Sequence, residues 1–379
     1  MNMKEQISSR QMIYVLILNR IGTIITLMSI IHMGPANQDI WLMMILSTFY
    51  CLLFNIPLLF LAMKFSNSSI IEYMEKIFGK FIGKILGISY GLFFIRIAVL
   101  YYYIEIQMIR TTFMEELSPV IIILVLMLVL IYVASRGLEV SVRTIEFFGP
   151  IVILSLIFYV VLGFNNIDLT VLLPIYGDST LSGINIGALE ASLIFTDPNL
   201  LAMNFPSLSN KKDAVKIVVK SKIISQLIII MMVIATQVSL GVEQARHSNF
   251  PFLTYVRLVR TYSIFERIEA VFLTTWLIIV MTRVVSYLYI SGKAFKQVFN
   301  KRNIKPFIYG VGIFMGIALY YISDISPKLT FLFSRKIEEY YYYFIFNIGI
   351  PILAIIIYYI RRKDYIRRKD FRKQERLGS

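Results

Sequence analysis

Charged residues that lie inside apolar stretches long enough to cross a bilayer include Arg20, Arg96, Glu190, Asp197 and Arg283. Placing one such side chain in hydrocarbon costs at least ~2.5–3.5 kcal/mol, so these residues are expected to pair with one another or face a polar cavity. In one interpretation they form an ion-pair network in which Asp197 takes one arginine. In the other, a spare cation or the amides of a broken helix receive the carboxylate of a bound solute. We favour the second, because three cations oppose one deep anion and Glu190 sits nearer the outer end of its span. Which arginine pairs with Asp197 stays open.

The deep anion stands next to a proline in the stretch GALEASLIFTDPNLLAMNFP, which runs from Gly187 to Pro206. Pro198 has no N–H to donate, and its ring clashes with the carbonyl four residues earlier, that of Ile194. A carbonyl freed in hydrocarbon costs several kcal/mol unless a polar group satisfies it. A broken spanning segment is tolerated where it lines a cavity or holds a solute. The stretch is therefore predicted to be one wall of a binding site midway across the membrane.

Composition places the whole chain in a membrane. Of its 379 residues, 58% are hydrophobic and only 16% are charged, whereas about a quarter of a soluble domain is charged. One cysteine and two histidines offer no paired metal ligands, and nucleotide-binding or hydrolytic motifs are missing, so we expect neither a metal, a cofactor nor an enzyme. The net charge of +15 could suggest a nucleic-acid partner. Because the cations gather in connecting segments and in the tail, we expect none.

Ten apolar runs are long enough to span a bilayer. They cover about 11–33, 40–63, 85–109, 119–135, 144–164, 185–207, 217–240, 268–292, 306–323 and 340–360. An even number of spans puts both termini on one side. Most of the 38 lysines and arginines fall in the segments on that side, including Lys211 to Lys222 and the C-terminal run, which predicts cytoplasmic termini.

Five spans in each half would give two units of opposite orientation, that is, an inverted repeat. We expect one membrane domain over residues 1–363, with repeats of about 11–164 and 185–360. The first helix of each repeat has a weak point, at Gly22-Thr23 and at 196–198 respectively. Residues 364–379 form a basic tail that is predicted to bind anionic lipid headgroups.

Several segments resemble one family of membrane proteins. They are FERIEAVFLTTW at 265–276, FGKFIGKILG at 78–87, SVRTIEFFGPIV at 141–152 and LLPIYGD at 172–178. In these segments the chain resembles the B subunits of nutrient germinant receptors, which are spore germination permeases of the amino acid–polyamine–organocation superfamily. The resemblance implies an all-α integral membrane protein with ten transmembrane helices, a LeuT-like 5+5 inverted repeat and broken helices 1 and 6.

The resemblance also implies a ligand site between the broken helices, flanked by helices 3 and 8. Carried onto this chain, it comprises Ile21, Gly22, Thr23, Phe93, Ile97, Phe195, Thr196, Asp197, Thr282 and Arg283. Two features depart from the family pattern. Helix 1 has one glycine, Gly22, where many relatives have a G-x-G break, and helix 6 has Thr196-Asp197-Pro198 where many have Gly-Glu. Both departures alter the pocket, so the ligand is not specified.

The implied function is sensing. A germinant, commonly an amino acid, would bind this subunit in the spore inner membrane, and the signal would pass to an A-type membrane subunit and a C-type lipoprotein. An ion-coupled amino-acid transporter of the same fold is the alternative, with Asp197 as a coupling carboxylate. A passive conduit opened by partners is a third hypothesis, and the chain has no ring of charges that would favour it.

Overall fold

The computed structural model describes residues 5–32, 34–114, 116–163, 168–258, 268–325 and 336–361. Within these ranges the chain is helical apart from its connections and one isolated parallel bridge between Ile7 and Leu208. The basic tail predicted at 364–379 and residues 265–267 of the family-like run lie outside the described residues. The boundary of the tail therefore stays a prediction, and so do the two repeats.

Eight described helical segments are long and apolar enough to cross a membrane. Their helices are α1 (Ser9–His32), α2 (Ile40–Lys64), α4 (Lys80–Thr112), α6 (Leu138–Leu162), α9 (Ala214–Leu240), α12 (Ile268–Val298), α13 (Lys305–Ile325) and a last one that continues from α15 (Lys336–Phe344) through the π-helical turn η7 (Ile345–Gly349) to Arg361. A shorter apolar helix, α5 (Pro119–Ser135), and the pair α7 (Leu181–Leu193) and α8 (Asp197–Asn204) stand at the two remaining expected spans. The protein is thus an all-α multi-pass membrane protein.

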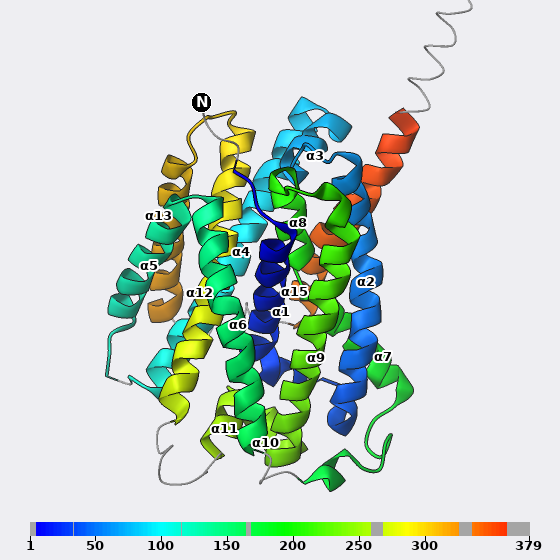
Figure 1. The fold of residues 1–379 in the computed structure, drawn as a ribbon, viewed down its shortest axis with the longest axis vertical. Coiled ribbons are helices and arrows are strands. Elements are labelled where there is room, and N and C mark those ends of the chain that lie inside the picture. The colour runs from blue at the N-terminus through cyan, green and yellow to red at the C-terminus, as the bar shows by residue number, and fades with distance from the viewer. Residues whose placement is uncertain are drawn as a thin grey trace, which may run out of the picture.

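Short helices close the ends of the bundle. They are α3 (Ile70–Phe78), α10 (Val242–His247), α11 (Pro251–Leu258) and the 3-10 turns η1 (Asn37–Asp39), η3 (Leu169–Leu172), η4 (Phe205–Ser207) and η5 (Lys211–Asp213). Helix α3 begins with a capping box, in which the Ser69 hydroxyl accepts from the Glu72 N–H while the Glu72 carboxylate accepts from the Ser69 N–H. Helices α10 and α11 lie at the opposite end from α3 (Figure 1).

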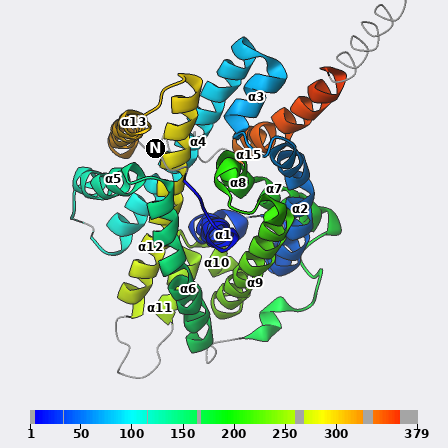
Figure 2. The same cartoon turned by 45° about the horizontal axis from the view of Figure 1, so that its top comes forward.

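Helix α1 runs through the middle of the bundle, with α6, α8, α9 and α12 around it (Figure 2). From Val15 to Met28 every residue of α1 is buried, including the polar residues Asn19 and Arg20. Helices α5 and α13 lie side by side at the periphery in both views (Figures 1 and 2). Large apolar side chains such as Leu128 and Ile313 are exposed there. This distribution suits a protein whose outer surface is solvated by lipid.

The N-terminal segment is tied to the connection that follows α8. The Ile7 N–H donates to the Ser207 carbonyl at 2.9 Å, and the Ser209 N–H donates to the Ile7 carbonyl at 2.9 Å. The Glu5 carboxylate accepts from the Leu138 N–H at the start of α6 and from the Tyr289 hydroxyl of α12. Four parts of the chain therefore meet at the end of the bundle where the N-terminus lies (Figure 1).

The predicted break in the sixth span is confirmed, whereas the predicted break in the first span is misplaced. Gly22 and Thr23 are helical, and the non-helical residue of α1 is Leu27, with φ −103° and ψ 15°. Gly22 serves close packing instead, because a Cβ there would lie 3.1 Å from the Ile279 Cγ2 of α12. The Thr23 hydroxyl donates to the Asn19 carbonyl one turn back, which is compatible with an unbroken helix.

Candidate ligand site at the broken helix

The sixth span is interrupted between Leu193, the last residue of α7, and Asp197, the first residue of α8. Thr196 precedes α8, and Pro198 lies in its first turn, where the missing N–H breaks no helical hydrogen bond. The Asn347 amide of η7 donates to the carbonyls of Leu193 (3.2 Å) and Phe195 (3.4 Å). A side chain from the last helix thus satisfies carbonyls that the break exposes, as a membrane interior requires.

Asp197 is held by two cations. Its carboxylate lies 3.2 Å from the Lys222 Nζ of α9 and 3.4 Å from the Arg20 Nη1 of α1, and all three side chains are buried. The sequence had assigned Lys222 to the inner connecting segment, and this was wrong because Lys222 lies more than two turns after Ala214, inside the spanning helix α9. The wider excess of lysine and arginine in the connecting segments does not depend on this one residue.

Arg20 is fully engaged inside the bundle. Its Nε donates to the Ser225 hydroxyl at 2.9 Å, and its Nη2 donates to the Gln226 side-chain carbonyl at 3.0 Å. Its guanidinium carbon also lies 3.7 Å from the centre of the Phe195 ring, a cation–π contact. With all three guanidinium nitrogens hydrogen-bonded and the Phe195 ring against one face, Arg20 fits the role of a structural partner of Asp197.

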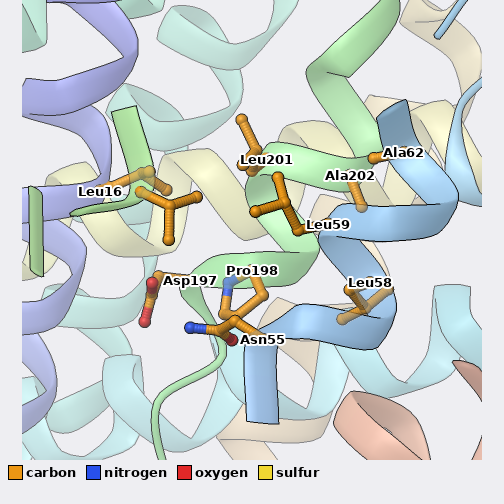
Figure 3. Close-up of a pocket in the computed structure, with 10 residues that line it drawn as sticks. Leu16, Asn55, Leu58, Leu59, Ala62, Asp197, Pro198, Leu201 and Ala202 are labelled. Carbon is orange, nitrogen blue, oxygen red and sulfur yellow. The ribbon is translucent and has the colours of Figure 1, made fainter. Parts of the chain in front are cut away.

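A small cavity lies beside the Asp197 carboxylate. Its volume is about 10 Å³, which admits about one water molecule. Apart from Asp197 and Asn55, its wall is apolar, and the Asn55 amide extends toward the carboxylate (Figure 3). The Asn55 Nδ2 donates to no described residue. One water between the two side chains would satisfy the amide, whereas an amino acid would not fit in this cavity.

Arg283 of α12 approaches the break from another side. Its Nη1 donates to the Asn19 carbonyl at 2.6 Å, and its Nη2 donates to the Thr196 hydroxyl at 3.2 Å. Its guanidinium carbon lies 3.8 Å from the centre of the Tyr101 ring. Among the described residues, no carboxylate oxygen lies within 4 Å of this guanidinium. Arg283 is thus a buried cation whose hydrogen-bond and ring partners among the described residues are all neutral.

The Asn19 side chain supplies an unused acceptor beside this cation. Its Nδ2 donates to the Val15 carbonyl at 2.8 Å, while its Oδ1 accepts no hydrogen bond from the described residues. The Thr196 hydroxyl also contacts the Tyr287 hydroxyl of α12. A cation, an amide oxygen and two hydroxyls therefore meet where α1, α12 and the break come together. This donor and acceptor set suits a small molecule that carries both a carboxylate and an ammonium group.

The structure brings together part of the predicted ligand set. Arg283 contacts Thr196, and a Cβ on Gly22 would lie 3.7 Å from the Arg283 Cδ. Phe195 and Asp197 form a second group around Arg20, rather than around Arg283.

The remaining predicted residues are buried but contribute less directly. Ile21, Ile97 and Thr282 lie within the packed interior. Phe93 stacks on Phe346 of the last helix, with ring centres 4.4 Å apart. A ligand role for these residues stays a prediction.

The structure also places the two other predicted intramembrane charges. The Arg96 guanidinium carbon lies 4.4 Å from the centre of the Tyr342 ring. Glu190 is half-buried in α7.

Sequence reasoning missed four polar residues of the bundle: Asn19, Glu105, Lys222 and Asn347. Lys222 had a visible signal, because the apolar run assigned to its helix begins before it. Glu105 had the same signal, because it lies inside the run 85–109. A buried asparagine gives a weaker signal, since one polar residue barely changes the mean hydropathy of a span. The role of Asn347 depends on the π-helical turn that places it, and π-helical turns are rare and frequent at functional sites.

Spanning helices arranged around a broken, charged segment are typical of secondary transporters. In agreement with this class, the structure resembles a solved Na+-coupled sialic acid symporter, with a TM-score of 0.64 over 84% of this chain and 74% of that one. At 15% identity the likeness shows the fold alone. The LeuT-like fold is thereby confirmed.

The family model described as "Spore germination protein" matches residues 6–326. The chain therefore belongs to this family of germination permeases, as the sequence resemblance implied. It is 26% identical over 342 residues to spore germination protein KB of Bacillus subtilis (strain 168), with 89% of this chain and 88% of that protein covered. Similarity extends to two further proteins of that strain, spore germination protein YndE, at 21% over 88% of this chain and 91% of that protein, and spore germination protein A2, at 24% over 76% and 77%.

Proposed function

We propose that this permease-family protein is a germinant sensor that binds an amino acid at the break in the sixth span. The observation that carries the proposal is Arg283, a buried cation with neutral partners beside Thr196. A ligand carboxylate would take the place of the Asn19 carbonyl or the Thr196 hydroxyl on the guanidinium. Charge-assisted hydrogen bonds to arginine are short and strong, and a bidentate pair fixes orientation as well.

The charge balance around the break supports an anionic group. Among the described residues, Arg20, Lys222 and Arg283 surround the single carboxylate of Asp197. Burying excess positive charge in a dry bundle is costly, so an added carboxylate is favoured there. The free amide oxygen of Asn19 would accept from the ammonium group of the same ligand. The two features together point to an α-amino acid rather than to a simple carboxylate.

Binding is tested with the purified protein in nanodiscs, by adding each standard L-amino acid and, in parallel, the corresponding amino-acid amide. At least one amino acid should raise the midpoint of thermal unfolding, and its amide, which lacks the carboxylate, should not. Arg283→Gln should weaken binding by about tenfold or more, because a hydrogen bond to a charged group contributes about 1.5–3 kcal/mol.

The matched control is Arg96→Gln, which removes an arginine of the spanning helix α4 whose guanidinium packs on the Tyr342 ring. It should leave the affinity unchanged. Unaltered binding by Arg283→Gln, or stabilisation by the amide as strong as by the amino acid, would refute the assigned site. No response to any of the amino acids would refute the ligand class.

Uptake assays with the protein in proteoliposomes distinguish sensing from transport. We propose that the protein signals to an A-type membrane subunit and a C-type lipoprotein in the spore inner membrane, with both its termini in the cytoplasm and its basic tail on anionic lipid. Spores that lack it should lose the response to one germinant, and the two partners should co-purify with it. Ligand uptake that follows an imposed ion gradient would support the transporter alternative, which the fold also favours.

A further inference from the structure

A second buried carboxylate lies away from the broken helix. Glu105 of α4 is fully buried, and its Oε2 accepts from the Trp276 Nε1 of α12 at 2.6 Å. Its Oε1 accepts no hydrogen bond from the described residues. No described lysine, arginine or histidine nitrogen lies within 4 Å of it either.

An ionised carboxylate would be poorly stabilised at this position. It needs several donors or a cation to offset the loss of water, and here it has one neutral donor. A carboxylic acid has a far smaller demand, because it carries no net charge. In the closed arrangement described here, Glu105 is therefore more stable with a proton.

The groups around Glu105 do not change this balance. On its own helix the nearby titratable residues are Tyr101, one turn earlier, Tyr102, whose hydroxyl donates to the Ile123 carbonyl of α5 at 2.8 Å, Tyr103, and Arg110, five residues further on. Helix α5 has no charged residue. On α12 the nearest cation in sequence to Trp276 is Arg283, two turns further on, and its guanidinium packs on the Tyr101 ring. On α1 the buried cation is Arg20, which is paired with Asp197.

The Glu105–Trp276 pair contacts the end of the bundle at which α11 lies. Trp276 packs edge-on against Phe250, with ring centres 5.7 Å apart, and Phe250 directly precedes α11. Helix α11 lies at the end of the bundle opposite α3 (Figure 1). Any opening that separates α11 from α12 would uncover Trp276 and admit water to Glu105. Toward the other side, Tyr101 lies one turn before Glu105 on α4 and is stacked by Arg283.

We propose that Glu105 is a proton-exchange site. It holds a proton while the bundle is closed around Trp276. When this end opens, the O–H bond breaks, the proton passes to an entering water molecule and the carboxylate is hydrated. Closure reverses the step, so that each closing event takes up one proton.

The test needs no ligand, and it is therefore independent of the proposed amino-acid site. The chain has two tryptophans, so Trp41→Phe leaves Trp276 as the sole indole. In this background, the fluorescence of the full-length protein in nanodiscs is followed from about pH 5 to about pH 9, a range in which a buried glutamate titrates. We expect a single sigmoidal transition that Glu105→Gln abolishes. The control Glu190→Gln, which alters a half-buried glutamate of α7, should keep it.

Infrared difference spectra over the same range give a second readout. The carbonyl band of a protonated carboxylic acid should decrease as the pH rises and should be missing in Glu105→Gln. Trp276→Phe keeps the carboxyl group but removes its donor, so it should shift the band to higher frequency. This variant keeps the test valid even if Glu105→Gln fails to fold.

Three results would overturn the proposal: fluorescence that is independent of pH, a transition that persists in Glu105→Gln, or a carboxylic-acid band that stays constant to the upper end of the range. The last result would make Glu105 a permanently protonated structural residue.

Discussion

The pairing of one carboxylate with two cations makes a quantitative prediction about Asp197. In Asp197→Asn, Arg20 and Lys222 would lose their shared counter-ion while staying buried. Breaking a buried ion pair from one side costs about 3–5 kcal/mol, because the remaining charge is left uncompensated. Lys222→Met, by contrast, leaves the Asp197–Arg20 pair in place. Its cost should be nearer 1.5–3 kcal/mol, the contribution of a hydrogen bond to a charged group.

The double variant Asp197→Asn/Lys222→Met tests whether the stability lost in Asp197→Asn comes from uncompensated buried charge. Among the described residues, the Lys222 ammonium donates to Asp197 alone, so removing the ammonium from Asp197→Asn eliminates an uncompensated buried cation. Arg20 keeps its bonds to Ser225 and Gln226. The double variant should therefore be more stable than Asp197→Asn alone, even though it differs from the native chain at one more buried position.

The assay is the midpoint of thermal unfolding of the purified variants in one detergent. Arg143→Gln is the control, because Arg143 forms an exposed pair with Glu139 at 3.5 Å and such pairs contribute about 0–1 kcal/mol. The expected order of midpoints places the native chain and the control highest, then Lys222→Met, then the double variant and last Asp197→Asn. Additive losses in the double variant would refute the ion-pair argument.

Three further predictions concern the surroundings of the break. Asn347→Leu should lower the stability by about 1–3 kcal/mol for each of the two carbonyls it leaves unpaired, which urea or thermal unfolding would detect, and an unchanged midpoint would contradict the role of the amide. Gly22→Val should cost about 1–3 kcal/mol through overpacking against Ile279, and Gly22→Ala less. Because the Lys222 ammonium already neutralises the Asp197 carboxylate, no sodium ion is needed at that carboxylate. Replacing sodium by potassium should therefore leave amino-acid binding unchanged, and a strict sodium requirement would contradict this.

Much of the fold followed from patterns that depend on the bilayer. Spanning length, the excess of cations on one side and the proline beside Asp197 have few alternative explanations in hydrocarbon, so the spans and the sixth-helix break could be predicted. The break in α1 was misplaced because a glycine in a membrane helix has two uses. It can weaken a helix or admit a close neighbour, and Gly22 admits Ile279.

The candidate site was harder to predict because its partners come from distant parts of the chain. The lysine that pairs with Asp197 could have been noticed as a charge inside α9, but the choice of Arg20 over Arg283 depends on how α1 and α12 are rotated about their axes. Periodicity does not specify those rotations for helices that are apolar on nearly all sides. The Asn347 contact further requires a π-helical turn, which shifts the register of the last helix locally.

The short bridge between Ile7 and Leu208 has a practical consequence for experiments on this protein. The connection after α8 is fastened to the chain's own amino-terminal segment, so any displacement of that half-helix must be transmitted to residues 5–9 or tear the bridge open. A small spin label on a cysteine at position 6, where the Gln6 side chain is exposed, in a background in which Cys51 is replaced, would thus report movement of α8 from outside the binding region. An affinity tag at the N-terminus needs a long linker, because a large folded tag directly before Ile7 would disturb the hydrogen bonds between Ile7 and the connection after α8.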